Sequence, residues 1–188
     1  MPRRRKLIAR VTKLRGPKRM IVDANQTPLA DAQTWLNQHI AKPGAICPCC
    51  GRFAMVYHRT IHRTMAVVLI LMARRQPRGE FFHVSRYLAG LDLAPSFQAV
   101  ATHGGDYAKL RNWGLIESQP GERADGSTRT GFWRVTDQGF AFVHDQLRVP
   151  KHAIEFDNRL IGLDDAAGLV GIRDCLGDRF NYAELMRA

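Results

Sequence analysis

The sequence predicts an α+β fold, and three observations indicate it. Apolar residues recur at helical spacing over residues 29–40 and 58–75, a pattern typical of amphipathic or buried helices. Two short strands, at 115–117 and 132–135, flank a segment rich in Gly, Asp, Ser and Thr, which favours a hairpin. Hydrophobic residues make up 45% of the 188 residues, so the chain can form a globular core.

The two long helices carry different signals. Thr27 can cap the helix over 29–40, and Pro28 suits its first position. The helix over 58–75 is apolar on nearly every side of its middle. We therefore expect this second helix at the centre of the core.

Shorter elements are expected after the central helix. They are a helix over 82–88, a helix that ends at Gly114 and a helix that Thr136 caps. Beyond residue 148, the Asp157-Asn158 pair predicts a second hairpin. Two short helices, near 172–176 and 182–186, complete a C-terminal extension.

Positive charge is concentrated in the first 79 residues. They hold 16 Lys or Arg and two acidic residues, whereas residues 80–188 hold 12 basic and 15 acidic residues. The densest part is a basic arm over 1–19 without an acidic residue, in which Arg3, Arg4, Arg5 and Lys6 lie together. Several cations in a short segment can neutralise backbone phosphates. The arm therefore predicts nucleic-acid binding, with a solvated tail as the alternative.

A cysteine cluster precedes the central helix. Cys47 and Cys50 form a C-x-x-C pair followed by glycine, as in one knuckle of a zinc ribbon. One structural zinc ion would need further ligands, and the candidates are Cys49, His58 and His62. On the predicted helix, His58 and His62 are four residues apart, a spacing that can chelate a metal. Reduced structural cysteines or a redox pair, with surface histidines, are the alternative.

Two phrases in the middle of the chain, KLRNWGLIE at 109–117 and FWRVTDQG at 132–139, occur in an informative order. They resemble the recognition-helix end and the second wing strand of MarR-type winged helix-turn-helix regulators. The resemblance covers about 58–147. It leaves the arm, a segment over 20–57 with a helix and the cysteine knuckle, and the extension over 148–188. The whole chain also looks similar to uncharacterised phage and prophage proteins that join a Cys-Pro-x-Cys-Gly motif to such a domain.

The resemblance implies a regulator or nucleoid-type protein, from a phage or a bacterium, that binds double-stranded DNA. The recognition helix would lie in the major groove and the wing would follow the backbone. With the arm, the expected DNA contacts are Arg3, Arg4, Arg5, Lys6, Thr102, Lys109, Arg111, Asn112, Arg123 and Arg129. The alternative is a non-catalytic protein-interaction module that binds RNA or an acidic host protein. A homodimer fits either interpretation.

Signatures of catalysis and of membrane insertion are missing from the sequence. It contains no Walker loop, no G-x-S-x-G and no H-E-x-x-H. A His-Asn-His nuclease would also use cysteines and histidines, but the His-Asn-His order of such a nuclease is not found in the sequence. The longest apolar run, 66–73, is too short to cross a bilayer, and no signal peptide is recognised. We therefore expect a cytoplasmic protein that is not an enzyme.

Overall fold

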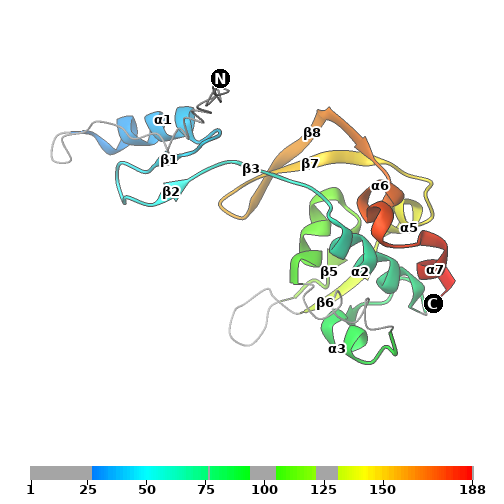
Figure 1. The fold of residues 1–188 in the computed structure, drawn as a ribbon. Helices are drawn as coiled ribbons and strands as arrows, with labels where there is room; N and C mark the ends of the chain where they lie inside the picture. The colour runs from blue at the N-terminus through cyan, green and yellow to red at the C-terminus, as the bar shows by residue number, and fades with distance from the viewer. Residues whose placement is uncertain (1–26, 76, 94–104, 122–130, 188) are drawn as a thin grey trace, which may run out of the picture. The chain divides into compact units, whose positions relative to one another are not determined.

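The structure is a computed structural model that describes residues 27–75, 77–93, 105–121 and 131–187. Within it the chain divides into two compact units, Met1–Val56 and Tyr57–Ala188. Both units combine helices with small antiparallel sheets (Figure 1), so the expected α+β class is confirmed. No helix in the described ranges is long and apolar enough to span a membrane.

The first unit contains one helix and one small hairpin. Helix α1 (Leu29–His39) packs against strand β1 (Ala45–Ile46), which pairs with β2 (Phe53–Ala54). The helix begins one residue later than a Thr27 cap requires, because Pro28 takes the cap position, where its side chain makes no capping hydrogen bond. Its expected apolar stripe is only partly buried, since Ala32 is buried but Leu29 is exposed.

A central helix organises the second unit. Helix α2 (Arg63–Arg74) is buried at every residue from Met65 to Ala73, as its apolar sequence predicts. It contacts a strand, three α-helices and a 3-10 helix that all follow it in the chain. The expected start of this helix at His58 is wrong, because Tyr57–Arg59 form strand β3 and pair with strand β7 (Val149–Phe156). As a result, His58 and His62 do not share a helix face.

A three-stranded antiparallel sheet lies next to α2. Its strands are β4 (Phe82–His83), β5 (Ile116–Ser118) and β6 (Phe132–Val135). Between β4 and β5 the chain forms helix α3 (Val84–Ala89) and the 3-10 helix η1 (Gly105–Trp113). The strands lie in the order β4-β6-β5. The helix expected over 82–88 begins later, at Val84, because Phe82 and His83 pair with Trp133 and Phe132 of β6.

Helix α5 (Asp137–Val143) follows β6 directly. The Gly139 amide donates to Thr136 Oγ1 at 3.0 Å, which confirms the expected cap. The same hydroxyl donates to the carbonyl of Gly114 at 2.6 Å. The two bonds hold the start of α5 against the turn between η1 and β5, where the backbone of Gly139 lies close to Leu115.

A second three-stranded sheet has the order β3-β7-β8. Strands β7 (Val149–Phe156) and β8 (Arg159–Val170) form the expected hairpin, in which Asp157 and Asn158 both have positive φ. Such φ values are those of a type I′ turn. The hairpin is longer than the sequence predicted.

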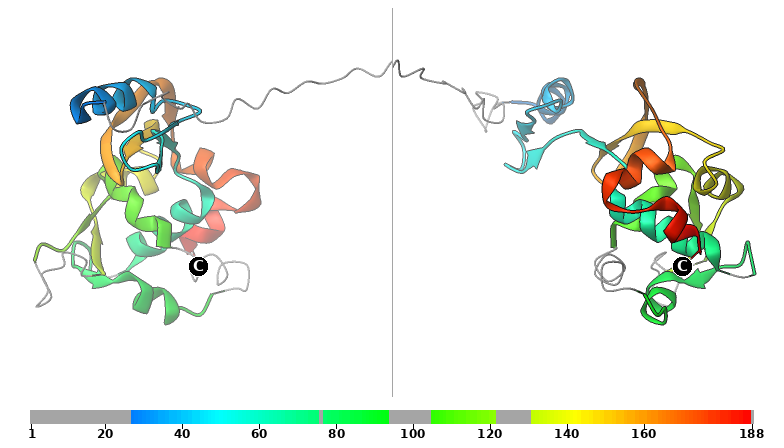
Figure 2. Two further views of the ribbon diagram at one scale, coloured as in Figure 1. Left: turned by 90° about the vertical axis from the view of Figure 1, so that its left-hand side faces the viewer. Right: turned by 45° about the vertical axis from the view of Figure 1, so that its right-hand side comes forward.

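The chain then forms α6 (Ile172–Leu176), the short 3-10 helix η2 (Gly177–Arg179) and α7 (Tyr182–Arg187). The sequence predicted both α-helices near these positions. Helices α6 and α7 lie beside α2 (Figure 2), and Ile172, Leu176 and Leu185 are part of the same core. The C-terminal segment is therefore built into the second unit.

Gly139→Ala is expected to lower the free energy of unfolding. The added Cβ would overlap the carbonyl oxygen of Leu115 and lie 2.7 Å from Val135 Cγ1. Extra volume in a packed site costs about 1–3 kcal/mol, and it acts against a gain of up to about 1 kcal/mol from alanine inside a helix. Urea denaturation followed by circular dichroism measures the difference.

Gly90→Ala is the matched control. Gly90 ends α3 with φ −88°, and an added Cβ would come no closer than 3.6 Å to its neighbours. Its stability should equal or slightly exceed that of the unchanged protein. Equal stability of the two variants would contradict the close contact at Gly139.

Candidate nucleic-acid interface and metal ligands

The described part of the expected recognition helix is η1, where two basic residues differ in their surroundings. Arg111 is exposed, and its side chain forms no hydrogen bond or ion pair with any described residue. Lys109 Nζ lies 3.0 Å from Asp106 Oδ1. The hydrogen bond from Lys109 holds the pKa of Asp106 below its usual value. The positive charge of Arg111 is therefore not paired with a described acidic residue, whereas that of Lys109 is paired with Asp106.

Asn112 has a structural contact that its sequence position did not indicate. Its Nδ2 donates to Glu155 Oε1 at 2.6 Å, and the same carboxylate accepts from Arg59 Nε at 3.1 Å. Glu155 is 6% exposed. The neighbouring Trp113 donates through Nε1 to the carbonyl of Pro150 at 2.7 Å. These contacts attach the end of η1 to strand β7, so the Asn112 amide is engaged inside the unit.

The other expected DNA contacts lie outside the described residues. They are Arg3, Arg4, Arg5, Lys6, Thr102, Arg123 and Arg129. The structure therefore describes the expected interface at Lys109, Arg111 and Asn112 alone.

The cysteine loop is held by the β1–β2 hairpin. The amide of Cys47 donates to the carbonyl of Arg52 at 2.8 Å, and the amide of Gly51 donates to the carbonyl of Cys47 at 2.9 Å. Backbone hydrogen bonds from Cys50 and then from Cys49 lower the pKa of the Cys47 thiol. These hydrogen bonds therefore favour the thiolate form of Cys47, which is the reactive form of a cysteine.

The histidines suggested as further zinc ligands belong to the second unit. His58 lies on β3, and His62 Nε2 lies 3.7 Å from Asp106 Oδ2. Within the described ranges, one group of three metal-ligating side chains gathers with its ligand atoms within 4.8 Å of one another: His58, His152 and Asp164. Sequence reasoning missed His152 and Asp164. A register shift between Ile154 and Glu155 brings these two residues opposite each other across β7 and β8, so the turn residues alone do not indicate the pairing.

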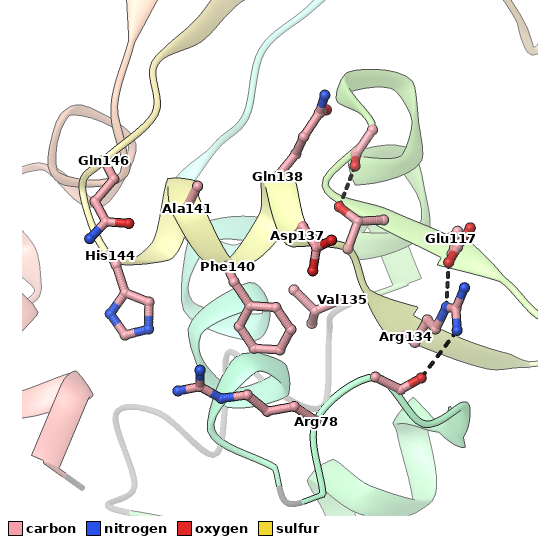
Figure 3. A pocket seen from close by; sticks show the side chains of 13 residues that line it. Arg78, Glu117, Arg134, Val135, Asp137, Gln138, Phe140, Ala141, His144 and Gln146 are labelled. Carbon is pink, nitrogen blue, oxygen red and sulfur yellow. Dashed lines mark hydrogen bonds and ion pairs between the residues drawn. The ribbon is translucent and has the colours of Figure 1, made fainter.

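An open groove of about 1060 Å³ runs beside α5. Figure 3 shows the Arg134 side chain directed toward Glu117, and Arg78 beside the ring of Phe140. Arg134 also donates to the carbonyl of Gly79 at 3.3 Å, and the Arg78 guanidinium lies 5.0 Å from the ring centroid. Both arginines already have partners, so the groove does not define an anion site.

The chain matches no protein-family model, no curated protein and no solved structure. Its function therefore has to be inferred from the fold and from the contacts of the residues above.

Cys47 is expected to react with iodoacetamide faster than Cys49 or Cys175 at neutral pH. Partial desolvation, followed by the nearby Cys47 thiolate, raises the pKa of Cys49, and burial raises the pKa of Cys175 to about 12. At a pH below the usual cysteine pKa of about 8.5, a thiol with a lower pKa has a larger fraction of the nucleophilic thiolate. Fragment mass spectrometry assigns the alkylated positions.

The same measurement tests the zinc knuckle. Added zinc should slow the alkylation of Cys47 and leave that of Cys175 unchanged, because a metal-bound thiolate is no longer free to react. Faster alkylation of Cys49 or Cys175 than of Cys47 would contradict the described hydrogen bonds.

Proposed function

We propose that the protein binds double-stranded DNA through a winged-helix core, with the basic arm adding electrostatic affinity. The observation that carries the proposal is the order of elements in the second unit: α2, β4, α3, η1, β5 and β6, with the strands arranged β4-β6-β5. This order agrees with the winged-helix resemblance of the sequence. In helix-turn-helix proteins the second helix of the motif lies in the major groove, and η1 occupies the end of the corresponding segment.

The contacts at the end of η1 support a role for this element as a rigid reading element. Asn112 and Trp113 attach it to β7, and Leu110, on the same element, is fully buried. Arg111 remains exposed on the same turn. A helix that is fixed on one side and carries a free cation on another can approach a phosphate without losing its packing.

Charge supports a division of work between the arm and the core. The formal net charge is +11, and the arm over 1–19 contributes nine basic residues without an acidic one. In the core, by contrast, Asp106 offsets Lys109. Affinity without sequence preference would come mainly from the arm, and orientation on the duplex from the core. A transcription regulator and a nucleoid-type protein, of phage or bacterial origin, both fit this proposal.

A protein-interaction module is the second candidate, and one observation favours it. The edge strand β8 exposes Leu160, Ile161 and Leu169 at 45%, 60% and 52%. Exposed apolar side chains on an unpaired strand edge are typical of surfaces that bind another chain. In this case the duplex measurements below would show no binding by the core.

Arg111→Ala is expected to weaken binding to duplex DNA of random sequence. A charge-assisted contact to a phosphate is worth about 1.5–3 kcal/mol, and its loss should also reduce the slope of log affinity against log salt by about one. Fluorescence anisotropy of a labelled duplex over a salt series measures both quantities.

Arg187→Ala is the matched control, because Arg187 is an exposed arginine on α7. It should keep the affinity and the salt slope of the unchanged protein. If Arg111→Ala binds duplex DNA as tightly as the unchanged protein and is equally stable, the proposal that η1 contacts DNA is contradicted.

Deletion of residues 1–19 is expected to flatten the salt dependence further. The deletion removes nine basic residues, and each lost phosphate contact should reduce the slope by about 0.9. The same salt series, with single-stranded RNA as a competitor, separates duplex binding from RNA binding. An unchanged slope would make the arm a solvated tail.

A further inference from the structure

The sheet β3-β7-β8 presents three metal-ligating side chains on one face, one from each strand. His152 on β7 is directly opposite Asp164 on β8. His58 on β3 is opposite Ile154, which is two residues from His152 along β7. Since side chains alternate between the faces of a strand, His58, His152 and Asp164 project to the same side.

The other face of this sheet is used for packing. Ala153 and Glu155 are buried there, and Glu155 binds Arg59 and Asn112. The histidine face is more open, because the side chains of His58, His152 and Asp164 are 41%, 24% and 24% exposed. The three ligands are therefore separated from the buried ion pair and can be reached by an ion from solvent.

The distances leave a gap between the two imidazoles and the carboxylate. His58 Nδ1 and His152 Nδ1 each lie 3.6 Å from Asp164 Oδ2, which is beyond hydrogen-bond reach. His152 Nδ1 is buried and has no hydrogen-bond partner among the described residues. A buried polar atom without a partner is destabilising, so this nitrogen lacks the contact that its position requires.

The carboxylate is already oriented toward the gap. Asp164 Oδ1 accepts from the amide of Ala167 at 3.3 Å, which leaves Oδ2 facing both histidines. Hydrogen bonds of this kind fix the direction of metal ligands in known sites. A tetrahedral ion with bonds of about 2.0–2.2 Å holds its ligands about 3.3–3.6 Å apart, so the two distances to Asp164 Oδ2 suit such an ion, and the ligand atoms of all three residues lie within 4.8 Å of one another.

We propose that His58, His152 and Asp164 form a binding site for a divalent transition-metal ion of the Zn²⁺ type. Two imidazole nitrogens and one carboxylate oxygen suit zinc and its neighbours better than Ca²⁺ or Mg²⁺, which prefer oxygen ligands. Three protein ligands leave one position for water. The ion would join the three strands of the sheet, and the proposal is independent of DNA binding and of the cysteine knuckle.

The competing interpretation is a plain ion-pair cluster, in which Asp164 attracts protonated histidine without any metal. To separate the two, we would use the full chain with Cys47, Cys49 and Cys50 all changed to Ser, which removes the knuckle thiols. Zn²⁺ binding is measured by isothermal titration calorimetry near neutral pH, and the melting temperature is measured with and without Zn²⁺.

About one equivalent of Zn²⁺ should bind to this background and raise its melting temperature, because a ligand that binds only the folded state stabilises it. His152→Ala should weaken binding by more than about 100-fold, since loss of even an outer-shell partner costs about 10- to 100-fold. His144→Ala, which changes an exposed histidine at the end of α5, should leave binding unchanged.

His58→Ala is the second test variant, in case His152→Ala does not fold. The side chain of His58 is 41% exposed, so it can be removed without opening the core. Circular dichroism shows whether each variant is folded. Absence of Zn²⁺ binding in the cysteine-free background would overturn the proposal in favour of the ion-pair cluster. Equal binding by the His58 and His152 variants and by the background would overturn it as well.

Discussion

The second unit depends on the burial of one helix on all of its sides. From Met65 to Ala73, no residue of α2 is more than 6% exposed. A helix without a polar face cannot lie at a surface, so it has to be enclosed. Strand β6 and η1 come from the middle of the chain, whereas α6 and α7 come from its end, and all of them contact α2. The enclosure determines where each later element can lie.

That constraint also explains which parts of the fold could be predicted from the sequence. Local signals were sufficient where a side chain or a turn residue acts on its own neighbours. Thr136 caps α5, and Asp157 with Asn158 takes the positive φ values of a tight turn. In the same way, the apolar sequence of α2 was enough to identify it as a central helix.

Local signals failed where a distant strand competes for the backbone. Residues 58 and 82 were expected in helices, yet each lies in a strand because β7 or β6 supplies its hydrogen-bond partners. Some side-chain partners could not be predicted either, because they also lie on strands distant in the sequence. The Asn112 amide was expected to face outward, but Glu155 from β7 accepts its hydrogen bond. The gathering of His58, His152 and Asp164 likewise depends on strand register, which the sequence does not specify over such separations.

The pairing of β3 with β7 has a consequence for how the chain acquires its structure. The bond between Arg59 and Glu155 joins residues 96 apart, so the first strand of the unit cannot pair until most of the unit has been synthesised. Contacts of such separation slow folding, because loop closure precedes any gain from them. Helices α6 and α7, which pack against α2, follow β7 in the chain and become available later still. A fragment limited to 58–147, the segment that the sequence resemblance covers, would therefore leave α2 exposed where α6 and α7 now pack against it.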